Sequence, residues 1–260
     1  MTSAEALDLQ TAADRLGVHY QTAYRWARSG VLEASLVAGR YRIDPDALSR
    51  FAATRSRPTR PSPRRPRDGF ERLRDRLHAQ LVGNEERAAR RLVADLLRDG
   101  VSVTTTIEEV IAPVMRRIGE NWAAGRTTIA EEHQASAIVE RVLAANLPSP
   151  RGRRRGVAVV AAPSGDRHAL PTLMAAAALR EDNWRVRHLG SDLPGDELSR
   201  LCAAEAVDLV VLTVTNAEAL EAAARAAATL EQLGTPVLIG HPGASLNELQ
   251  RLARRSRLRS

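Results

Sequence analysis

The amino-acid sequence predicts a multidomain protein with three folded parts: a small aromatic-rich unit, a four-helix bundle, and an α/β unit built on a parallel sheet. Three observations support this division. Five of the eight aromatic residues lie within the first 51 positions, which indicates a separate small core. Residues 68–147 repeat leucines at helical spacing. Beyond residue 155, short β-branched runs alternate with Ala-rich segments, which is typical of α/β folds.

The composition limits the class of protein. The chain has 260 residues and a formal charge of +7, and every basic residue other than histidine is Arg. Basic proteins often bind nucleic acid or anionic surfaces, although Arg-rich usage also follows from genomic base composition alone. The single Cys202 excludes a disulfide framework and a Cys-rich zinc site. Because the sequence has no apolar run of ~20 residues and no signal peptide, we expect a cytoplasmic protein with no membrane partner.

Residues 1–52 have the pattern of a helix-turn-helix followed by a hairpin. Two short predicted helices flank Gly17-Val18, and the second, over residues 19–29, has a polar face at its N-terminal end. A tight hairpin, "LVAGRYRI", follows and forms a wing. A helix of this kind enters the major groove, and a basic wing suits phosphates or the minor groove. The predicted DNA contacts are Gln21, Thr22, Arg25, Arg28, Arg40 and Arg42.

The stretch 6–52 resembles the excisionase-like, MerR-type winged helix-turn-helix. The turn, Trp26 in the second helix, the R-Y-R wing and the D-P-D-A-L opening of a last helix occur in the same order. The resemblance implies that one unit recognises half of a double-stranded DNA operator, so a homodimer or homotetramer is expected. The alternative is a small helical module for protein interaction.

The middle of the chain is predicted to be helical. Residues 53–67 carry six Arg and four Pro without a large apolar residue, which indicates an extended linker. A capping box at residues 128–131 opens the last predicted helix, and the short connections favour an antiparallel four-helix bundle over residues 68–147. The predicted helices are about 69–82, 85–98, 106–122 and 129–145.

The last part, 155–260, follows a second linker at 146–156 and is predicted to form a doubly wound, Rossmann-like (flavodoxin-type) domain with a parallel sheet. The loop after its first strand lacks both G-x-G-x-x-G and a P-loop, so neither dinucleotide nor NTP binding is supported. The predicted strands are 156–162, 184–190, 208–214 and 235–240, and the predicted helices are about 171–182, 195–205 and 217–232.

The loop after the first of these strands contains Asp166-x-His168. An Asp two residues before a His can accept the Nδ1–H of the ring and leave Nε2 as an oriented metal ligand. Together with Thr213-Val214-Thr215 and Gly240-His241, this loop is similar to the cobalamin-binding signature G-D-x-H-x-x-G, S-x-L, G-G. The resemblance implies that His168 is the lower axial cobalt ligand and Asp166 its partner. It also implies that Thr213 contacts the displaced nucleotide tail and that Gly240 gives the tail room.

The sequence departs from that signature at three positions. Pro171 replaces a Gly and adds bulk, Thr215 replaces a Leu and loses apolar bulk, and His241 replaces the second Gly. Members of the family usually continue with a fifth strand and a final helix after the point where this sequence stops. We therefore expect one edge of the sheet to be incomplete.

A third motif lies at the end of the predicted bundle. Trp122 is followed after nine residues by the adjacent pair Glu132 and His133. This W-x9-E-H pattern resembles the light-sensing, cobalamin-dependent repressors of the CarH/LitR type. The resemblance implies that adenosylcobalamin is the cofactor and that these three side chains surround its adenosyl group. Light-sensing members often have a His directly after the Trp as an upper ligand, whereas this sequence has Ala123.

The combined motifs predict a transcriptional regulator, most simply a repressor, rather than an enzyme. Adenosylcobalamin would assemble the oligomer that holds the operator, and light would dissolve it. Two alternatives stay open at this stage. One is a paralogue with a degenerate B12 domain that no longer binds cobalamin, and the other is a corrinoid shuttle protein of a methyltransferase system.

Overall fold

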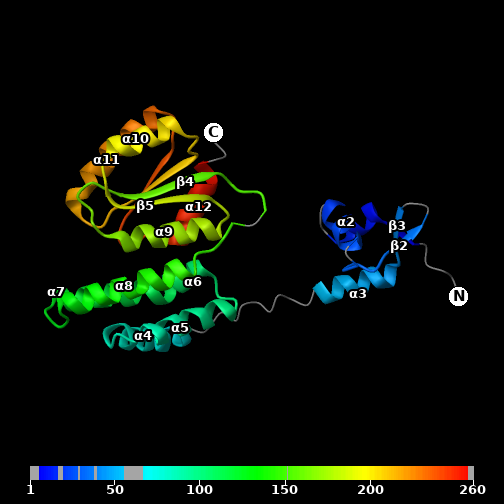
Figure 1. The fold of residues 1–260 in the computed structure, drawn as a ribbon, viewed down its shortest axis with the longest axis horizontal. Coiled ribbons are helices and arrows are strands. Elements are labelled where there is room, and N and C mark those ends of the chain that lie inside the picture. Colours follow the sequence, from blue (N-terminus) through cyan, green and yellow to red (C-terminus); the bar gives the residue numbers. More distant parts are fainter. Residues whose placement is uncertain are drawn as a thin grey trace. The chain divides into compact units, whose positions relative to one another are not determined.

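The protein is represented by a computed structural model that describes residues 6–16, 20–28, 30–37, 40–55, 67–150 and 152–256. The chain divides into two compact units, residues 1–64 and 65–260 (Figure 1). The bundle and the α/β part, which the sequence pattern separates, therefore lie in one unit.

The first unit forms a small helical core beside a three-stranded antiparallel sheet with the order β1-β3-β2. The Asp8 side chain caps α1 by accepting a hydrogen bond of 2.7 Å from Thr11 N. Ala12, Ala23 and Ile43 are fully buried and join helices and sheet. The predicted pair of helices and hairpin is confirmed, with β1 as an addition. The elements are β1 (Leu7–Asp8), α1 (Leu9–Arg15), α2 (Tyr20–Arg28), β2 (Ser35–Val37), β3 (Arg40–Ile43) and α3 (Pro45–Arg55).

The second unit begins with the predicted bundle. Its third helix starts at Val103, three residues earlier than expected, and runs through α6, a π-helical turn and α7. The predicted capping box is confirmed, because Thr128 Oγ1 accepts from Glu131 N and the Glu131 carboxylate accepts from Thr128 N. The elements are α4 (Arg67–Val82), α5 (Glu86–Arg98), α6 (Val103–Thr106), η1 (Ile107–Ile111), α7 (Ala112–Ala123) and α8 (Ile129–Ala145).

The π turn η1 has a local cause that the apolar pattern does not reveal. Pro113 lacks an N–H, so it cannot donate to the carbonyl of Glu109 four residues earlier. Arg74 on α4 donates to that carbonyl instead, with Nε at 2.5 Å, and its guanidinium also pairs with the Glu109 carboxylate at 3.0 Å. The irregular turn is thus fastened to the neighbouring helix.

The α/β part is built on a parallel sheet of four described strands with the order β5-β4-β6-β7. This confirms the predicted fold class. Among the described residues, β7 is the last strand and α12 follows it. The elements are β4 (Val157–Pro163), α9 (Ala169–Glu181), β5 (Arg185–Leu193), α10 (Gly195–Ala204), β6 (Leu209–Thr213), α11 (Ala217–Gln232), β7 (Val237–Gly240) and α12 (Leu246–Ser256).

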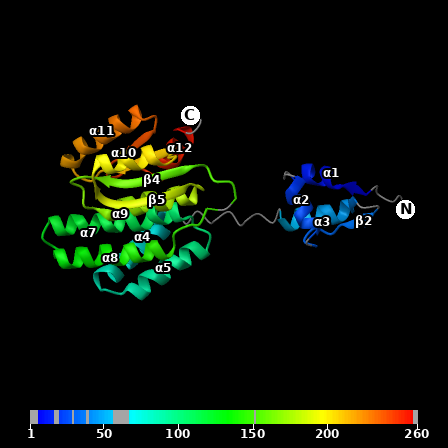
Figure 2. The ribbon, with the colours of Figure 1, turned by 45° about the horizontal axis from the view of Figure 1, so that its top comes forward.

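Helices cover both faces of this sheet (Figures 1 and 2). Ala158 and Val160 of β4 face α9 and α12, whereas Val159 and Ala161 face α10 and α11. The alternation follows from the two-residue period of a strand, and a strand that is apolar on both faces belongs in the middle of a sandwich.

Helix α9 joins the bundle to the sheet. Its residues 172–179 are all buried, because one side faces the sheet and the other faces the bundle. Ala176 and Leu179 belong to the core under the sheet, whereas Leu173 and Ala177 belong to the core of the bundle. A helix that is apolar all round is a helix buried on all sides. The bundle and the α/β part therefore share a continuous interior.

Two carboxylates fasten the bundle to the α/β part at one end. Glu181, at the end of α9, accepts hydrogen bonds from Val103 N at 2.7 Å and Thr104 N at 2.8 Å, and so caps α6. Glu108 accepts from Ser245 Oγ at 2.7 Å, just before α12. Because α6 begins at the C-terminal end of α9, α7 runs back and ends toward the N-terminal end of α9.

Candidate functional site

The candidate site lies where the strand order reverses direction. From the central β4, the chain moves to β5 on one side, and later to β6 on the other. In open α/β sheets, the carboxyl ends of strands diverge at such a switch point and leave room for a ligand. Asp166 and His168 follow β4 there, and Thr215 follows β6.

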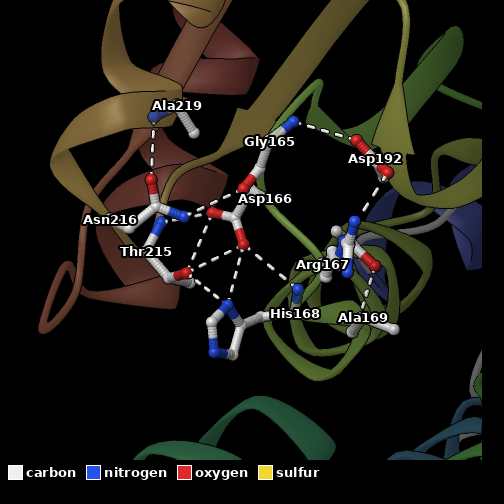
Figure 3. A network of polar contacts seen from close by, with 10 residues as sticks. Gly165, Asp166, Arg167, His168, Ala169, Asp192, Thr215, Asn216 and Ala219 are labelled. Atoms are coloured by element: carbon white, nitrogen blue, oxygen red, sulfur yellow. Dashed lines mark hydrogen bonds and ion pairs between the residues drawn. The ribbon is translucent and has the colours of Figure 1, made fainter.

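Asp166 is a fully buried carboxylate surrounded by donors (Figure 3). It accepts from Thr215 N at 2.6 Å, from Thr215 Oγ1 at 2.8 Å and from His168 N at 3.1 Å. Burial raises the pKa of Asp166, but the backbone hydrogen bonds from Thr215 and His168 and their side-chain bonds outweigh it, so its pKa lies below the ordinary value. The side chain is thus held as an anion that only accepts hydrogen bonds.

His168 stands at the N-cap position of α9, and its side chain is 66% exposed. Its Nδ1 lies 2.9 Å from Asp166 Oδ1 and 2.7 Å from Thr215 Oγ1. Because the carboxylate has no proton to give, hydrogen-bond chemistry assigns the ring proton to Nδ1 and the free lone pair to Nε2. The ring points away from the network in Figure 3, so Nε2 is available to a metal.

A second ring of contacts holds the loop that carries Asp166. Asp192 on β5 donates its N–H to Asp166 O at 2.8 Å, and its Oδ1 accepts from Gly165 N at 2.9 Å. Gly165 has φ of 87°, a conformation that favours glycine. Asn216 reaches Gly165 O with Nδ2 at 3.3 Å while its Oδ1 caps α11 at Ala219 N. The loop is therefore fixed before any ligand arrives.

Thr215 is the site residue that the sequence pattern misjudged. The sequence pattern treated it only as a replacement of the Leu of the signature that loses apolar bulk. In the structure, both its N–H and its hydroxyl donate to Asp166. The available signal was its place two residues beyond Thr213, at the switch point of the sheet. The Thr215 hydroxyl forms hydrogen bonds with Asp166, whereas the signature has an apolar Leu at this position and does not predict them.

Thr213 and Gly240 lie side by side, because they are register partners on β6 and β7. Thr213 is 7% exposed, and its Oγ1 has no hydrogen-bond partner among the described residues. A Cβ added to Gly240 would meet only Leu212 O, at 3.9 Å. A buried hydroxyl without a partner, next to an open glycine, suits a ligand that brings a polar group.

The structure accommodates the other two departures from the signature, Pro171 and His241. Pro171 is the third residue of α9 rather than the first, and its missing N–H is one of the four that no helix pairs internally. His241 is exposed beyond the end of β7.

The three residues predicted to surround the adenosyl group lie at the end of α7 and in the first turns of α8. Trp122 is 48% exposed near the end of α7. Glu132 Oε2 lies 2.7 Å from His133 Nδ1, and Glu132 Oε1 accepts from Ser136 Oγ at 2.9 Å. The structure brings Glu132 and His133 together, but no hydrogen bond or ring contact joins Trp122 to either of them within the described residues. Ala123 is exposed and offers no donor atom.

The structure describes part of the predicted DNA surface. Ala23 and Ala27 of α2 are buried, so this helix packs on the face opposite to the one expected to meet DNA. Arg28 and Arg42 are exposed, as a DNA contact requires. The side chains of Gln21, Thr22, Arg25 and Arg40 lie outside the described part of the structure.

The described residues form neither a membrane-spanning helix nor a cluster of metal ligands. None of their helices is both long enough and apolar enough to cross a membrane. None of their His, Cys, Asp and Glu side chains form a group of three that could hold a metal ion.

Comparisons with known proteins match both units. A family model described as "Helix-turn-helix domain" matches residues 6–56, and one described as "B12 binding domain" matches residues 73–145, which form the bundle. The fold of the second unit is similar to that of the monomethylamine corrinoid protein of Methanosarcina barkeri, with a TM-score of 0.59 at 16% identity, over 71% of this chain and 98% of that one.

Two curated relatives come from Myxococcus xanthus. The chain is 32% identical over 193 residues to the HTH-type transcriptional repressor CarA, which covers 70% of this chain and 62% of CarA. It is 33% identical over 141 residues to the HTH-type transcriptional repressor CarH, which covers 53% of this chain and 47% of CarH. The chain thus spans about half to three fifths of the length of these relatives. A helix-turn-helix domain thus precedes a B12 binding domain in this chain, and the chain is similar to the HTH-type transcriptional repressors CarA and CarH.

Proposed function

We propose that this protein is a DNA-binding transcriptional repressor that binds adenosylcobalamin and changes its oligomeric state in response to light or to the cofactor. The observation that carries the proposal is the His168 imidazole. Asp166 and Thr215 orient its ring through Nδ1, and Nε2 is open at the switch point of the sheet. Few structural roles require an exposed His to be held so firmly by a buried carboxylate.

The residues around His168 fit the lower side of a cobalamin. The cofactor would supply a cobalt centre with a light-sensitive Co–C bond. His168 Nε2 would bind the cobalt, and Asp166 would hold the ring in the required orientation. The unpaired Thr213 hydroxyl would meet the nucleotide tail, and Gly240 would leave space for it.

The α7–α8 turn suits the upper side. The half-exposed indole of Trp122 offers an apolar surface for the adenosyl group, and Glu132 and His133 offer hydrogen bonds to its ribose and adenine. Because Ala123 follows Trp122, the chain offers no imidazole at that position as a further cobalt ligand. His133 is the nearest alternative donor along the chain.

The first unit would bind a double-stranded DNA operator. Its α2 would enter the major groove, and the β2–β3 wing with Arg42 would contact the backbone. Since one such unit recognises one half-site, a homodimer or homotetramer would form the complete reader. This conclusion agrees with the names of the relatives, which are HTH-type transcriptional repressors.

The absorption spectrum of the full chain tests the proposal. With adenosylcobalamin in the dark we expect a bound, His-ligated spectrum that changes on illumination, and a matching change in oligomeric state by light scattering. His168→Ala should abolish the His-ligated form, whereas His241→Ala, another exposed His in this part, should retain it. A chain that binds no chromophore would be a cobalamin-independent regulator, and this result would overturn the cofactor assignment.

The same experiment separates a second candidate. The likeness of the fold to the monomethylamine corrinoid protein favours a corrinoid shuttle. That function predicts a methyl-corrinoid complex that passes its methyl group to an acceptor and has no affinity for DNA. Binding to duplex DNA that depends on adenosylcobalamin contradicts it.

A further inference from the structure

Basic side chains gather at the edge of the sheet opposite the candidate cobalamin site. Residues 152–156 lead into β4, residue 185 begins β5, and α12 ends beside them. The loop before β4 and the end of α12 lie on the same side in Figures 1 and 2. We call this set the amino-edge patch; its members are Arg153, Arg154, Arg155, Arg185, Arg254 and Arg255.

Hydrogen bonds and ion pairs hold part of the patch in place. Arg254 Nε lies 2.9 Å from both carboxylate oxygens of Asp182, and Arg155 Nε donates to Asp182 O at 2.7 Å. The neighbouring Asn183 donates its Nδ2 to Arg153 O at 2.6 Å. The arginines of the loop and of α12 are therefore held around one turn of the chain.

Three carboxylates near the patch are engaged in hydrogen bonds. The Asp182 side chain is 4% exposed, and Glu181 is engaged with the N–H groups that begin α6. Asp208 accepts from Val157 N at 2.7 Å. Arg153, Arg185 and Arg255 are exposed.

We propose that the amino-edge patch is a second DNA contact that binds the phosphate backbone without regard to sequence. This inference rests on the proposed function. Guanidinium groups form bidentate hydrogen bonds with phosphate oxygens, and a patch spread along an edge suits a long anionic polymer better than a small ligand. The first unit, tethered to the same chain, would keep DNA at a high local concentration near the patch.

The salt dependence of DNA binding measures this contact. For the full chain with adenosylcobalamin in the dark, the variant Arg153→Gln/Arg185→Gln should bind operator and random-sequence duplexes more weakly by the same factor. The slope of log affinity against log salt should fall by about 0.9 for each lost phosphate contact, thus by about two. This variant retains Arg155 and Arg254, so the contacts to Asp182 stay intact.

A charge-matched control separates a local contact from net charge. Arg87→Gln/Arg225→Gln removes the same charge from α5 and α11 and should leave the slope unchanged. If the patch variant has the wild-type slope, or if both variants lower it equally, the second contact does not exist. Loss of binding to polyglutamate with unaltered DNA binding would also overturn the inference, in favour of an acidic protein partner. A wild-type chain that binds no duplex at all would instead overturn the proposed function itself.

Discussion

Asp166 and Asp182 flank the two ends of α9, and both are buried carboxylates with different partners. Asp166 lies just before the helix and takes its hydrogen bonds from neutral groups of Thr215 and from His168. Asp182 lies at the C-terminal end, where the helix dipole disfavours a negative charge, and pairs with two guanidinium groups.

The difference between the two ends separates a ligand site from a structural clamp. At Asp182, cations neutralise the carboxylate and no reactive group remains. At Asp166, neutral donors satisfy the carboxylate, and the remaining partner is an imidazole whose second nitrogen is free. A buried acid that orients an exposed His is typical of a metal-ligand pair.

The largest effect is expected from Asp166→Asn. Its amide NH2 would face the donors of Thr215 and His168, so the free energy of unfolding should fall by about 3 kcal/mol at neutral pH. Urea denaturation measures the loss. The exposed Glu197→Gln, which only removes an ion pair with Arg200, should cost less than about 0.5 kcal/mol. A loss as small as that of Glu197→Gln would show that the network does not stabilise the fold.

The Asp166 network also predicts a pH dependence. The pKa of Asp166 is lowered from the ordinary value of 3.8, so its contribution to stability is full above that value and is lost as pH falls through the folded pKa. The stability gap between wild type and Asp166→Asn should therefore be widest near neutral pH and narrow in acid. A gap that widens on acidification contradicts a depressed pKa.

Asp182→Asn should have the next largest effect. It breaks the clamp of Arg155 and Arg254, but these side chains are 42% and 48% exposed, so screening limits the loss to about 2 kcal/mol. The imidazole 15N shifts of His168 should stay unaltered, because the change lies at the other end of α9. Altered His168 shifts would contradict the independence of the two ends.

Thr215→Val should cost about 1 kcal/mol, the usual value of one hydrogen bond, and leave the backbone N–H bond to Asp166 in place. The more informative result is the tautomer of His168, followed by 15N NMR without cofactor. Loss of the Oγ1 contact should lower the share of the Nδ1–H form. Thr215→Ser keeps the hydroxyl and should behave as wild type; a Val variant with the same tautomer share would remove Thr215 from the site.

Gly240→Ala should have the smallest effect on stability, below about 0.5 kcal/mol, because the added Cβ meets only Leu212 O at ordinary contact distance. Its affinity for adenosylcobalamin should nevertheless fall, since the methyl group would occupy the space proposed for the nucleotide tail. Spectroscopic titration measures this affinity. Unaltered affinity would place the tail elsewhere.

Much of the fold could be predicted from local patterns. The bundle helices and the four strands follow from apolar spacing, and the capping box at Thr128 follows from residue types three positions apart. The π turn at η1 could not be predicted in this way. It depends on Arg74, 35 positions away from Glu109, which supplies the donor that Pro113 lacks.

Local sequence patterns likewise predict only part of the candidate site. Asp166-x-His168 is a local motif, so its hydrogen bond is visible in the sequence. Thr215 lies 49 positions after Asp166 in the sequence. The parallel pairing of β4 and β6 brings the carboxyl ends of these strands, and therefore the two residues, together. The meeting of Asp182 with Arg254, 72 positions apart, likewise depends on how α12 packs against α9.

The sequence by itself determined the elements, their order and the Asp166-x-His168 motif that we propose to bind a metal, because these depend on neighbours along the chain. Only the tertiary structure decided that α9 serves both bundle and sheet, that Thr215 completes the histidine network, and that arginines from three segments meet at one edge. Such contacts depend on strand order and helix packing, which join residues that no local pattern relates.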